Sequence, residues 1–317
     1  KTVSVWGGED GSYDTSTGVS ETPEYGKVFI SIKSTTGVDL TSVQKTNLES
    51  ALAPYKVASI TPVVVDAETT SLILGITIMY DTSSTTYTGA QIESLVATTI
   101  SNYSNNELET FNSPFRHSKV LGLIDNTDSS ILNSVATVTM GKLFSPTLSS
   151  STSYNLNFNN KFYNPTSGYN AAGGGVIAST GFYLNGVTTT EYFFDDDGVG
   201  NLRLYYLVSG VRTYINNTAG TVDYEKGKIT INSIVITGVG LVDNQSSSQV
   251  RITALPNSND ITPVRNQILE IDQVNTTYVS NVDATASTGV GYTTTTTAGT
   301  TTTTVTSVSS TPSTSAY

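Results

Sequence analysis

Residues 71–80 read Ser-Leu-Ile-Leu-Gly-Ile-Thr-Ile-Met-Tyr, and this stretch decides the fold of the N-terminal half. Every second residue is a large aliphatic one, so Leu72, Leu74, Ile76 and Ile78 fall on one face of an extended chain. A period of two is typical of a strand with one buried face. We therefore expect residues 71–80 to form a core strand of a sheet.

One helix is expected before this strand in the sequence and another after it. Thr41 and Gln44 have the spacing of a capping box, and Thr88 and Gln91 repeat that spacing. The first pair predicts a helix over residues 42–52, and the second pair predicts a helix with a single apolar stripe. The apolar residues that these helices would bury are Val43, Leu48, Ala51 and Leu52 in the first, and Ile92, Leu95, Val96, Ile100 and Tyr103 in the second.

A third, shorter helix is expected from Ser113-Pro114 through about Ile124, with proline at the first helical position. The strands expected in the same half are residues 2–6, 28–32, 59–65, 71–80 and 135–141. This order of strands and helices predicts an α+β domain over residues 1–145, built on a ferredoxin-like antiparallel sheet with helices.

Helical periodicity disappears after Pro146, and short strands with turn signals predict a small all-β domain over residues 146–283. Its clearest signal is a hairpin over residues 221–231, in which Gly227 would supply a positive φ in a three-residue loop. The strands expected here are residues 154–158, 181–184, 192–194, 202–208, 212–216, 221–224, 228–236 and 249–255.

The last segment, residues 284–317, contains no charged residue and includes the threonine runs 293–297 and 300–304. This composition is typical of a disordered or sugar-decorated tail. Because threonine is β-branched and favours extended backbone, an arm lying on a neighbouring molecule fits the composition equally well. We therefore expect an uncharged Thr/Ser-rich tail or an extended C-terminal arm.

The charge balance of the 317-residue chain argues against one class of partner. Lys and Arg number 15 against 26 Asp and Glu, which gives a net charge of −11, whereas nucleic-acid binding requires a basic face. Cysteine is absent, so disulfides and thiolate metal sites are excluded. No apolar run reaches the roughly 18 residues of a membrane-spanning helix. We expect neither nucleic acid nor a membrane as a partner.

No group of residues has the spacing of a catalytic site. His117 is the only histidine and no serine lies in a nucleophile-elbow motif, so a polar helix face is the simpler interpretation of His117. The run Asp195-Asp196-Asp197-Gly198 lacks the alternate spacing of a calcium loop and predicts a turn between two strands. The run Gly173-Gly174-Gly175 predicts a flexible loop. We therefore predict no enzyme, no cofactor, no metal ion and no small-molecule substrate.

Several segments, most of them in the first 140 residues, together resemble a known family. Residues 3–10 read Val-Ser-Val-Trp-Gly-Gly-Glu-Asp, and residues 111–119 read Phe-Asn-Ser-Pro-Phe-Arg-His-Ser-Lys. The other segments are residues 23–33, 59–62 and 124–131, with weaker anchors at 220–224 and 257–261. In this order they resemble the C-terminal region of the baseplate wedge proteins (the sixth gene product) of T-even-like contractile-tailed bacteriophages.

The resemblance implies a structural function. Members of this family pair within each wedge, join wedge to wedge in a closed ring around the baseplate hub, and rearrange when the sheath contracts. It also implies a place in the virion tail baseplate after assembly in the host cytoplasm. The implied partners are other copies of this chain and other baseplate wedge proteins. The Thr-rich tail has no counterpart in the family pattern.

A chain of low charge suits permanent association, because low surface charge reduces the cost of desolvating a large contact. Only 13% of the residues are charged. We expect one contact surface on the first domain, around residues 6–10 and the helix start at 114–119. The predicted interface residues are Trp6, Glu9, Asp10, Tyr25, Phe115, Arg116, His117 and Lys119.

A second class of function stays open at this point. The chain contains 18 Tyr, 53 Thr and 40 Ser, and exposed tyrosine and hydroxyl side chains suit contact with glycans. A carbohydrate-binding or adhesin module of a virion or cell surface is therefore the alternative. A glycoside hydrolase would need two carboxylates across a cleft, and the sequence indicates no such pair.

Overall fold

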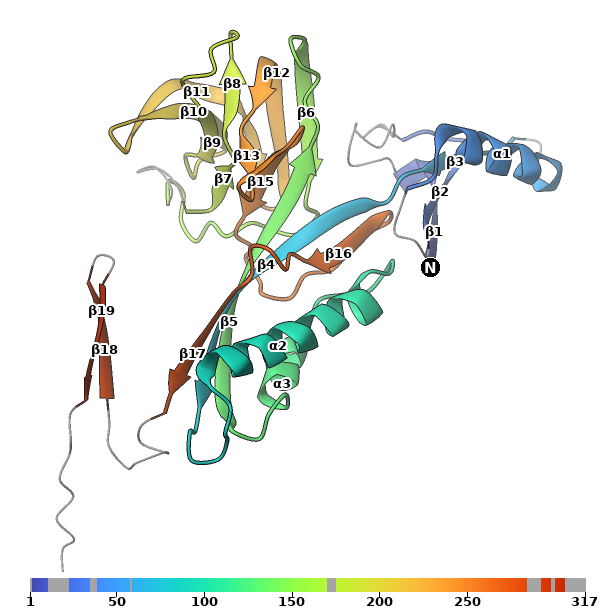
Figure 1. Cartoon of the computed structure of the whole chain (residues 1–317). Coiled ribbons are helices and arrows are strands. Elements are labelled where there is room, and N and C mark those ends of the chain that lie inside the picture. The colour runs from blue at the N-terminus through green and yellow to red at the C-terminus, as the bar shows by residue number, and fades with distance from the viewer. Residues whose placement is uncertain are drawn as a thin grey trace, which may run out of the picture. The chain divides into compact units, whose positions relative to one another are not determined.

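The computed structural model describes residues 2–10, 23–34, 39–57, 59–169 and 175–283, together with the backbone of 292–297 and 300–305 (Figure 1). These residues form a mixed α+β fold rich in strands. The chain divides into two compact units that alternate along the sequence. The first contains Lys1–Leu74, Tyr103–Arg116 and Val138–Thr276, and the second contains Gly75–Asn102, His117–Thr137 and Thr277–Tyr317. The three domains expected at residues 1–145, 146–283 and 284–317 stay a prediction.

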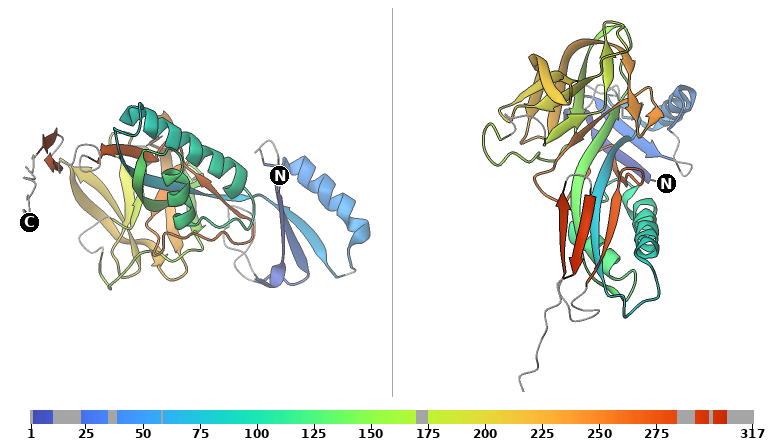
Figure 2. Two further views of the ribbon diagram at one scale, coloured as in Figure 1. Left: turned by 90° about the horizontal axis from the view of Figure 1, so that it is seen from below. Right: turned by 60° about the vertical axis from the view of Figure 1, so that its left-hand side comes forward.

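A three-stranded sheet opens the first unit and contains β1 (Thr2–Gly7), β2 (Lys27–Lys33) and β3 (Thr61–Val65). β1 runs antiparallel to β2, and β2 runs parallel to β3. The helix α1 (Ser42–Leu52) connects β2 to β3 and lies beside the sheet in Figures 1 and 2. A small core stabilises this sheet, because the rings of Trp6 and Phe29 stack with centroids 5.7 Å apart and pack with Val65.

The first predicted helix is confirmed in its bounds, but its predicted burial is wrong. The capping box of Thr41 and Gln44 is present, yet no residue of α1 is buried and Val43 is 67% exposed. The reason is that polar groups hold α1 against β3. The Lys45 ammonium lies 2.6 Å from Asp66, and Glu49 accepts a hydrogen bond from the Val64 backbone N–H at 2.8 Å.

The core strand predicted at residues 71–80 is confirmed as β4 (Glu68–Tyr80). Its predicted face is buried, with Leu72, Leu74, Ile76 and Ile78 each no more than 1% exposed. Within the first unit, β4 pairs in parallel with β16 (Gln267–Ile271). Within the second unit, β4 pairs in parallel with β17 (Thr277–Val282). Both of these partners come from the far end of the sequence.

The ferredoxin-like arrangement is not confirmed. It requires the strands of the first half to share one sheet, whereas β1, β2 and β3 form a sheet of their own. β4 and β5 (Ile131–Phe144) instead lie side by side with strands from beyond residue 249, and β15 (Val250–Ala254) pairs with β5. Periodicity along a segment indicates a strand but does not identify the strand that it pairs with.

The second predicted helix is confirmed as α2 (Gly89–Tyr103), followed by a π-helical turn, η4 (Ser104–Leu108). Its capping residues pair as expected, since the Thr88 backbone N–H donates to Gln91 at 2.8 Å. The third helix, α3 (His117–Asp125), begins later than predicted, and Pro114 is not its first residue. The cause is Phe115, whose backbone N–H and C=O pair with those of Ile261 at 2.8 and 3.1 Å and are therefore extended.

The β-rich part of the first unit contains a closed circuit of strands. Neighbouring pairs run from β10 to β11, β12, β8 and β9, and β9 pairs again with β10. The predicted strands 212–216 and 221–224 form a single strand, β11. The sequence did not predict β7, β16 or β17. The strands are β6 (Ser151–Asn157), β7 (Ile177–Ser179), β8 (Phe182–Leu184), β9 (Tyr192–Asp196), β10 (Asn201–Val208), β11 (Val211–Asp223), β12 (Lys228–Val239), β13 (Leu241–Val242) and β14 (Gln245–Ser246).

The predicted hairpin joins β11 to β12, and Gly227 has the expected positive φ of 66°. Asp223 lies opposite Lys228, so residues 224–227 form a four-residue loop instead of the predicted three-residue loop. Gly227 also lies close to another segment, because a Cβ at this position would stand 2.0 Å from the carbonyl oxygen of Asn160. Both constraints favour glycine here.

In the C-terminal segment, β18 (Tyr292–Thr297) and β19 (Thr300–Val305) pair antiparallel. Residues 284–291, 298–299 and 306–317 lie outside the described residues, as do Gly173 and Gly174 of the predicted flexible loop. An arm that lies on a neighbouring molecule therefore stays a prediction.

Replacing Gly227 with Ala should lower the free energy of unfolding by about 3 kcal/mol or more, through backbone strain and steric clash. Gly210→Ala is the matched control, because Gly210 has a φ of +82° with no atom within 4 Å of its Cβ position. This control should lose only about 1–2 kcal/mol. Urea unfolding followed by circular dichroism measures both values, and equal losses would contradict the close approach at Asn160.

Candidate assembly interface

β1 is an edge strand of the three-stranded sheet, and among the described strands only β2 pairs with it. Its 6 residues contain neither a charged residue nor a proline, and they pair with β2 without a bulge. Val3 and Val5 are 55% and 58% exposed. Charges, prolines and bulges usually prevent edge strands from pairing with other chains, and β1 has none of these features.

Two other strands have an edge N–H that is covered by a carboxylate. On β3, the backbone N–H of Val64 donates to Glu49 of α1 at 2.8 Å. On β17, the N–H and hydroxyl of Ser280 donate to Glu93 of α2 at 2.8 and 2.7 Å. A carboxylate in this position occupies a donor that a further strand would use. β1 therefore differs from these two strands.

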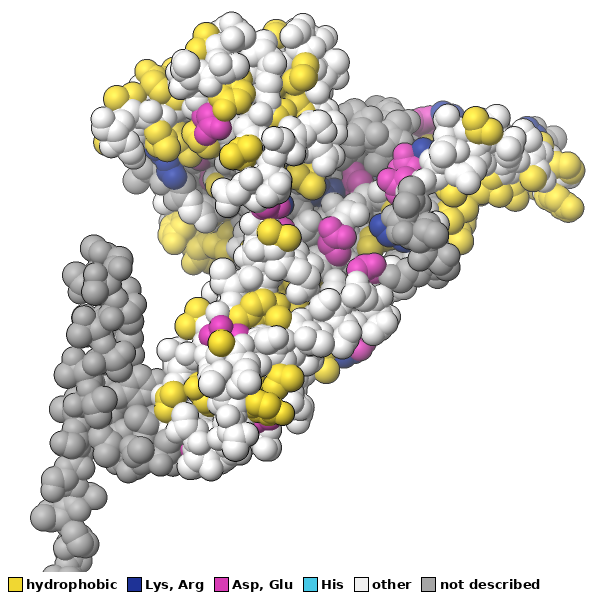
Figure 3. All heavy atoms as spheres, viewed as in Figure 1, with side chains coloured by type: hydrophobic (Ala, Val, Ile, Leu, Met, Phe, Trp, Pro, Cys, Tyr) yellow, Lys and Arg dark blue, Asp and Glu magenta, His cyan; other side chains and the backbone are white. Residues whose placement is uncertain are grey.

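The sheet face that carries Val3 and Val5 is apolar across all three strands. Val3 lies opposite Ile32, and Val5 lies opposite Ile30. Ile30 lies opposite Val64, which is only 6% exposed, so the exposed part of this face lies on β1 and β2. In Figure 3, hydrophobic side chains gather over this sheet and α1 at the right of the view. Other exposed apolar residues in this part of the chain are Tyr25, Val43, Tyr55 and Val57. An apolar surface of this kind is typical of a protein–protein contact.

The predicted interface residues near the N-terminus divide between core and surface. Trp6 is only 9% exposed because it packs on Phe29, whereas Tyr25 is 82% exposed and Glu9 is exposed. The side chain of Asp10 lies outside the described part of the chain. The sequence analysis missed Val3 and Val5, although the uncharged alternating strand at residues 2–6 is a signal that could have indicated them.

The predicted residues around α3 also occupy different environments. Phe115 is fully buried, and the exposed Arg116 guanidinium lies 3.0 Å from Asp260. The half-buried His117 donates from Nε2 to the Ala136 carbonyl at 2.9 Å, while Lys119 is exposed. A polar helix face is what the sequence predicted for His117. Contact of these residues with a partner stays a prediction.

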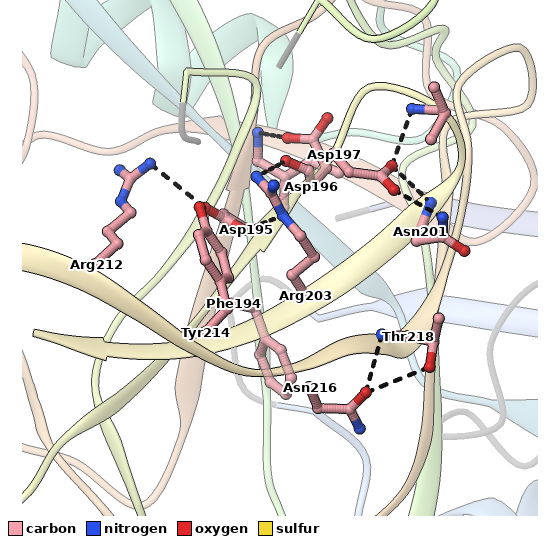
Figure 4. A network of polar contacts seen from close by, with 12 residues as sticks. Phe194, Asp195, Asp196, Asp197, Asn201, Arg203, Arg212, Tyr214, Asn216 and Thr218 are labelled. Carbon is pink, nitrogen blue, oxygen red and sulfur yellow. Dashed lines mark hydrogen bonds and ion pairs between the residues drawn. The ribbon is translucent and has the colours of Figure 1, made fainter. Parts of the chain in front are cut away.

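The three consecutive aspartates form a buried polar network and a turn (Figure 4). Asp195 lies on β9 with a fully buried side chain, 3.0 Å from Arg203 and 3.4 Å from Arg212, and it accepts the Tyr214 hydroxyl at 2.8 Å. Burial raises the pKa of Asp195, whereas Tyr214 and the two guanidinium groups oppose this shift. The carboxylate is therefore committed to partners within the chain.

The other two aspartates are occupied as well. Asp196 is buried on β9 and accepts hydrogen bonds from the Tyr224 hydroxyl at 2.6 Å and from the Ile177 N–H at 3.1 Å. Asp197 accepts the backbone N–H groups of Val199 and Asn201, both at 2.9 Å. The predicted turn is confirmed from Asp197 onward, but Asp195 and Asp196 are strand residues.

Within the described ranges, no group of three or more His, Cys, Asp or Glu side chains could hold a metal ion. Among the described helices, none combines the length and the apolar character needed to cross a bilayer. The candidate site is therefore the exposed apolar surface of β1 and β2.

Comparison with known proteins places the first 143 residues beside phage baseplate structural proteins. Residues 1–65 match the family model described as baseplate structural protein gp6, C-terminal domain I, and residues 72–143 match its C-terminal domain III. The gap between the two matches falls where β3 ends and β4 begins. The boundary between the two family domains therefore coincides with the boundary between the two sheets. The baseplate wedge protein gp6 of Enterobacteria phage T4 is 30% identical over 115 residues, 36% of this chain.

That alignment covers 17% of the phage T4 protein, so the chain spans a small part of this relative. The resemblance to the C-terminal region of the baseplate wedge proteins is confirmed by residues 1–65 and 72–143. The matched stretches contain β1 and its apolar sheet face.

Tyr224→Phe should make stability less dependent on alkaline pH. Burial raises the pKa of Tyr224, and the hydrogen bond to Asp196 raises it further. At pH 8 the variant should lose about 1–3 kcal/mol of unfolding free energy. Above about pH 10, Tyr224 ionises in the unfolded chain but stays protonated in the folded one, so the stability of the wild type falls. The difference in unfolding free energy between the wild type and the variant therefore becomes smaller.

Urea unfolding at pH 8 and pH 10.5 measures this difference. Tyr169→Phe, at a tyrosine that is 52% exposed, is the control and should show the same small difference from wild type at both values. A stability difference between Tyr224→Phe and the wild type that is larger at pH 10.5 than at pH 8 would contradict a raised pKa of Tyr224.

Proposed function

We propose that this chain is a structural subunit of a phage tail baseplate wedge, located in the virion and without enzymatic activity. The observation that carries the proposal is the open, uncharged edge of β1 with its apolar face, because it lies in the stretch that matches C-terminal domain I. An unprotected edge strand is a liability in a monomer but is useful in a permanent assembly. The baseplate wedge protein of phage T4 supports the same role.

In this function the chain joins neighbouring wedges into a ring around the hub, and it takes part in the rearrangement that accompanies sheath contraction. A closed ring of heterologous contacts needs two different surfaces on each subunit. The β1 edge supplies one. Arg116 and Lys119, which the sequence predicted to share one surface with residues 6–10, are assigned to the second in this proposal. Its partners are other copies of the chain and other wedge proteins, and assembly takes place in the host cytoplasm.

Val5→Lys should weaken self-association at least tenfold, because a lysine on the edge strand adds charge to a surface that would otherwise be buried. Val274→Lys is the control, since Val274 is 74% exposed in the turn after β16 and its replacement changes the charge equally. Light scattering across a dilution series gives the mass of each chain. A wild-type mass that stays monomeric throughout, or equal association of both variants, would contradict the proposal for this surface.

The double variant Arg116→Glu and Lys119→Glu tests the second surface. Reversing both charges should reduce association with the remaining wedge proteins at least tenfold, through charge repulsion across the contact. Co-purification of the wedge components with this chain measures the effect. Because Arg116 also pairs with Asp260, Asp260→Ala controls for loss of that ion pair alone. Unchanged association of the double variant would remove residues 116–119 from the interface.

A further inference from the structure

A shallow cavity of about 490 Å³ lies at one end of β8, β9 and β10 in the first unit. Its volume is within the range of small-molecule sites. The residues that line it are Tyr183, Thr188, Thr189, Thr190, Glu191, Phe193, Tyr206 and Leu207. Three aromatic residues, three threonines and one glutamate thus line one cavity, which neither the baseplate resemblance nor the β1 edge explains.

The aromatic side chains of the cavity are held in place by other rings. Tyr206 makes a T-shaped contact with Tyr192, with ring centroids 5.8 Å apart. Phe193 stacks on Tyr205 with centroids 5.6 Å apart. Tyr183 packs on the backbone of β12, because a Cβ at Gly238 would stand 3.2 Å from its ring. Rings fixed in this way lose little conformational entropy when a ligand binds.

Glycines position the carboxylate of the cavity. Cβ atoms at Gly181 and Gly240 would stand 2.9 and 2.8 Å from the Glu191 carboxylate, so the carboxylate packs closely on the backbone at these two glycines. The Tyr183 hydroxyl donates to Oε1 of Glu191 at 3.1 Å. Oε2 accepts no hydrogen bond from the described residues. The carboxylate is therefore held by one hydrogen bond, and its other oxygen is available to a ligand.

The chemistry of the lining favours a particular class of ligand. None of the described residues that line the cavity is a lysine or an arginine, and Glu191 would repel an anion. Flat aromatic faces suit the C–H face of a sugar ring, while the free carboxylate oxygen and the threonine hydroxyls suit its hydroxyl groups. We propose that this cavity binds a neutral saccharide, a function independent of the proposed baseplate role.

The test is saturation-transfer NMR of the full chain with three neutral probes, lactose, maltotriose and N,N′-diacetylchitobiose. At least one probe should bind. Tyr206→Ala removes an aromatic face and Glu191→Gln removes the charged acceptor, so each variant should weaken that binding at least tenfold. Tyr169→Ala is the control, because Tyr169 is 52% exposed, pairs with Tyr163 and lies outside the cavity lining. It should bind as the wild type does.

Choline chloride is the decisive competitor, because aromatic rings beside a carboxylate also suit a quaternary ammonium ion. The proposal is overturned when none of the three sugars binds, or when choline binds and they do not. Sugar binding that survives both Tyr206→Ala and Glu191→Gln overturns the proposed site. Circular dichroism of Glu191→Gln, which preserves side-chain size, separates loss of binding from loss of folding.

Discussion

The parallel pairing of β4 with two distant strands is the constraint on which the rest of the structure depends. Residues 68–72 pair with β16 in the first unit, and residues 75–80 pair with β17 in the second. Burial of the aliphatic face of β4 stabilises this pairing, since each fully buried Leu or Ile contributes about 1.5–3 kcal/mol. A loop of nearly 200 residues must close before these contacts form, and loop entropy rises only slowly with such a length. The circuit of strands that carries the cavity lies entirely within this loop.

The parts of the fold that depend on neighbours in sequence could be predicted from the sequence. The capping-box spacings indicated where α1 and α2 begin. The alternation of apolar residues indicated which face of β4 is buried. The parts that depend on distant partners could not be predicted, because nothing in residues 71–80 identifies β16 or β17 as a neighbour. The same limit applies to the candidate interface. Trp6 lies on β1 and Tyr25 lies in the turn before β2, and both are aromatic. Only the packing of Trp6 on Phe29 identifies Trp6 as a core residue and leaves Tyr25 on the surface.

The aspartate run shows how one sequence motif can serve two structural purposes. Asp197 closes a turn through backbone N–H groups, as a local pattern can predict. Asp195 and Asp196 instead depend on Arg203, Arg212, Tyr214 and Tyr224, which are contributed by the neighbouring strands β10 and β11 and by the loop that follows β11. A buried carboxylate without partners is strongly destabilising, so the circuit is stable only when these strands are in register. A shift in register would separate these groups from the carboxylates, so the network favours the observed strand pairing.

The β1 edge and the aromatic cavity differ in the kind of contact that each can make. The edge offers backbone groups that pair with no other described strand, beside two exposed valines, and such an edge gives affinity along a strand and little selectivity for small ligands. The cavity offers fixed rings and a single free carboxylate oxygen, which discriminate between ligands but cover too little area to hold two proteins together. The first kind of surface serves the proposed role as a structural subunit, and the second serves the proposed binding of a saccharide. Because the cavity lining lies outside residues 1–143, a change there leaves the matched stretches intact, so the two functions can vary independently.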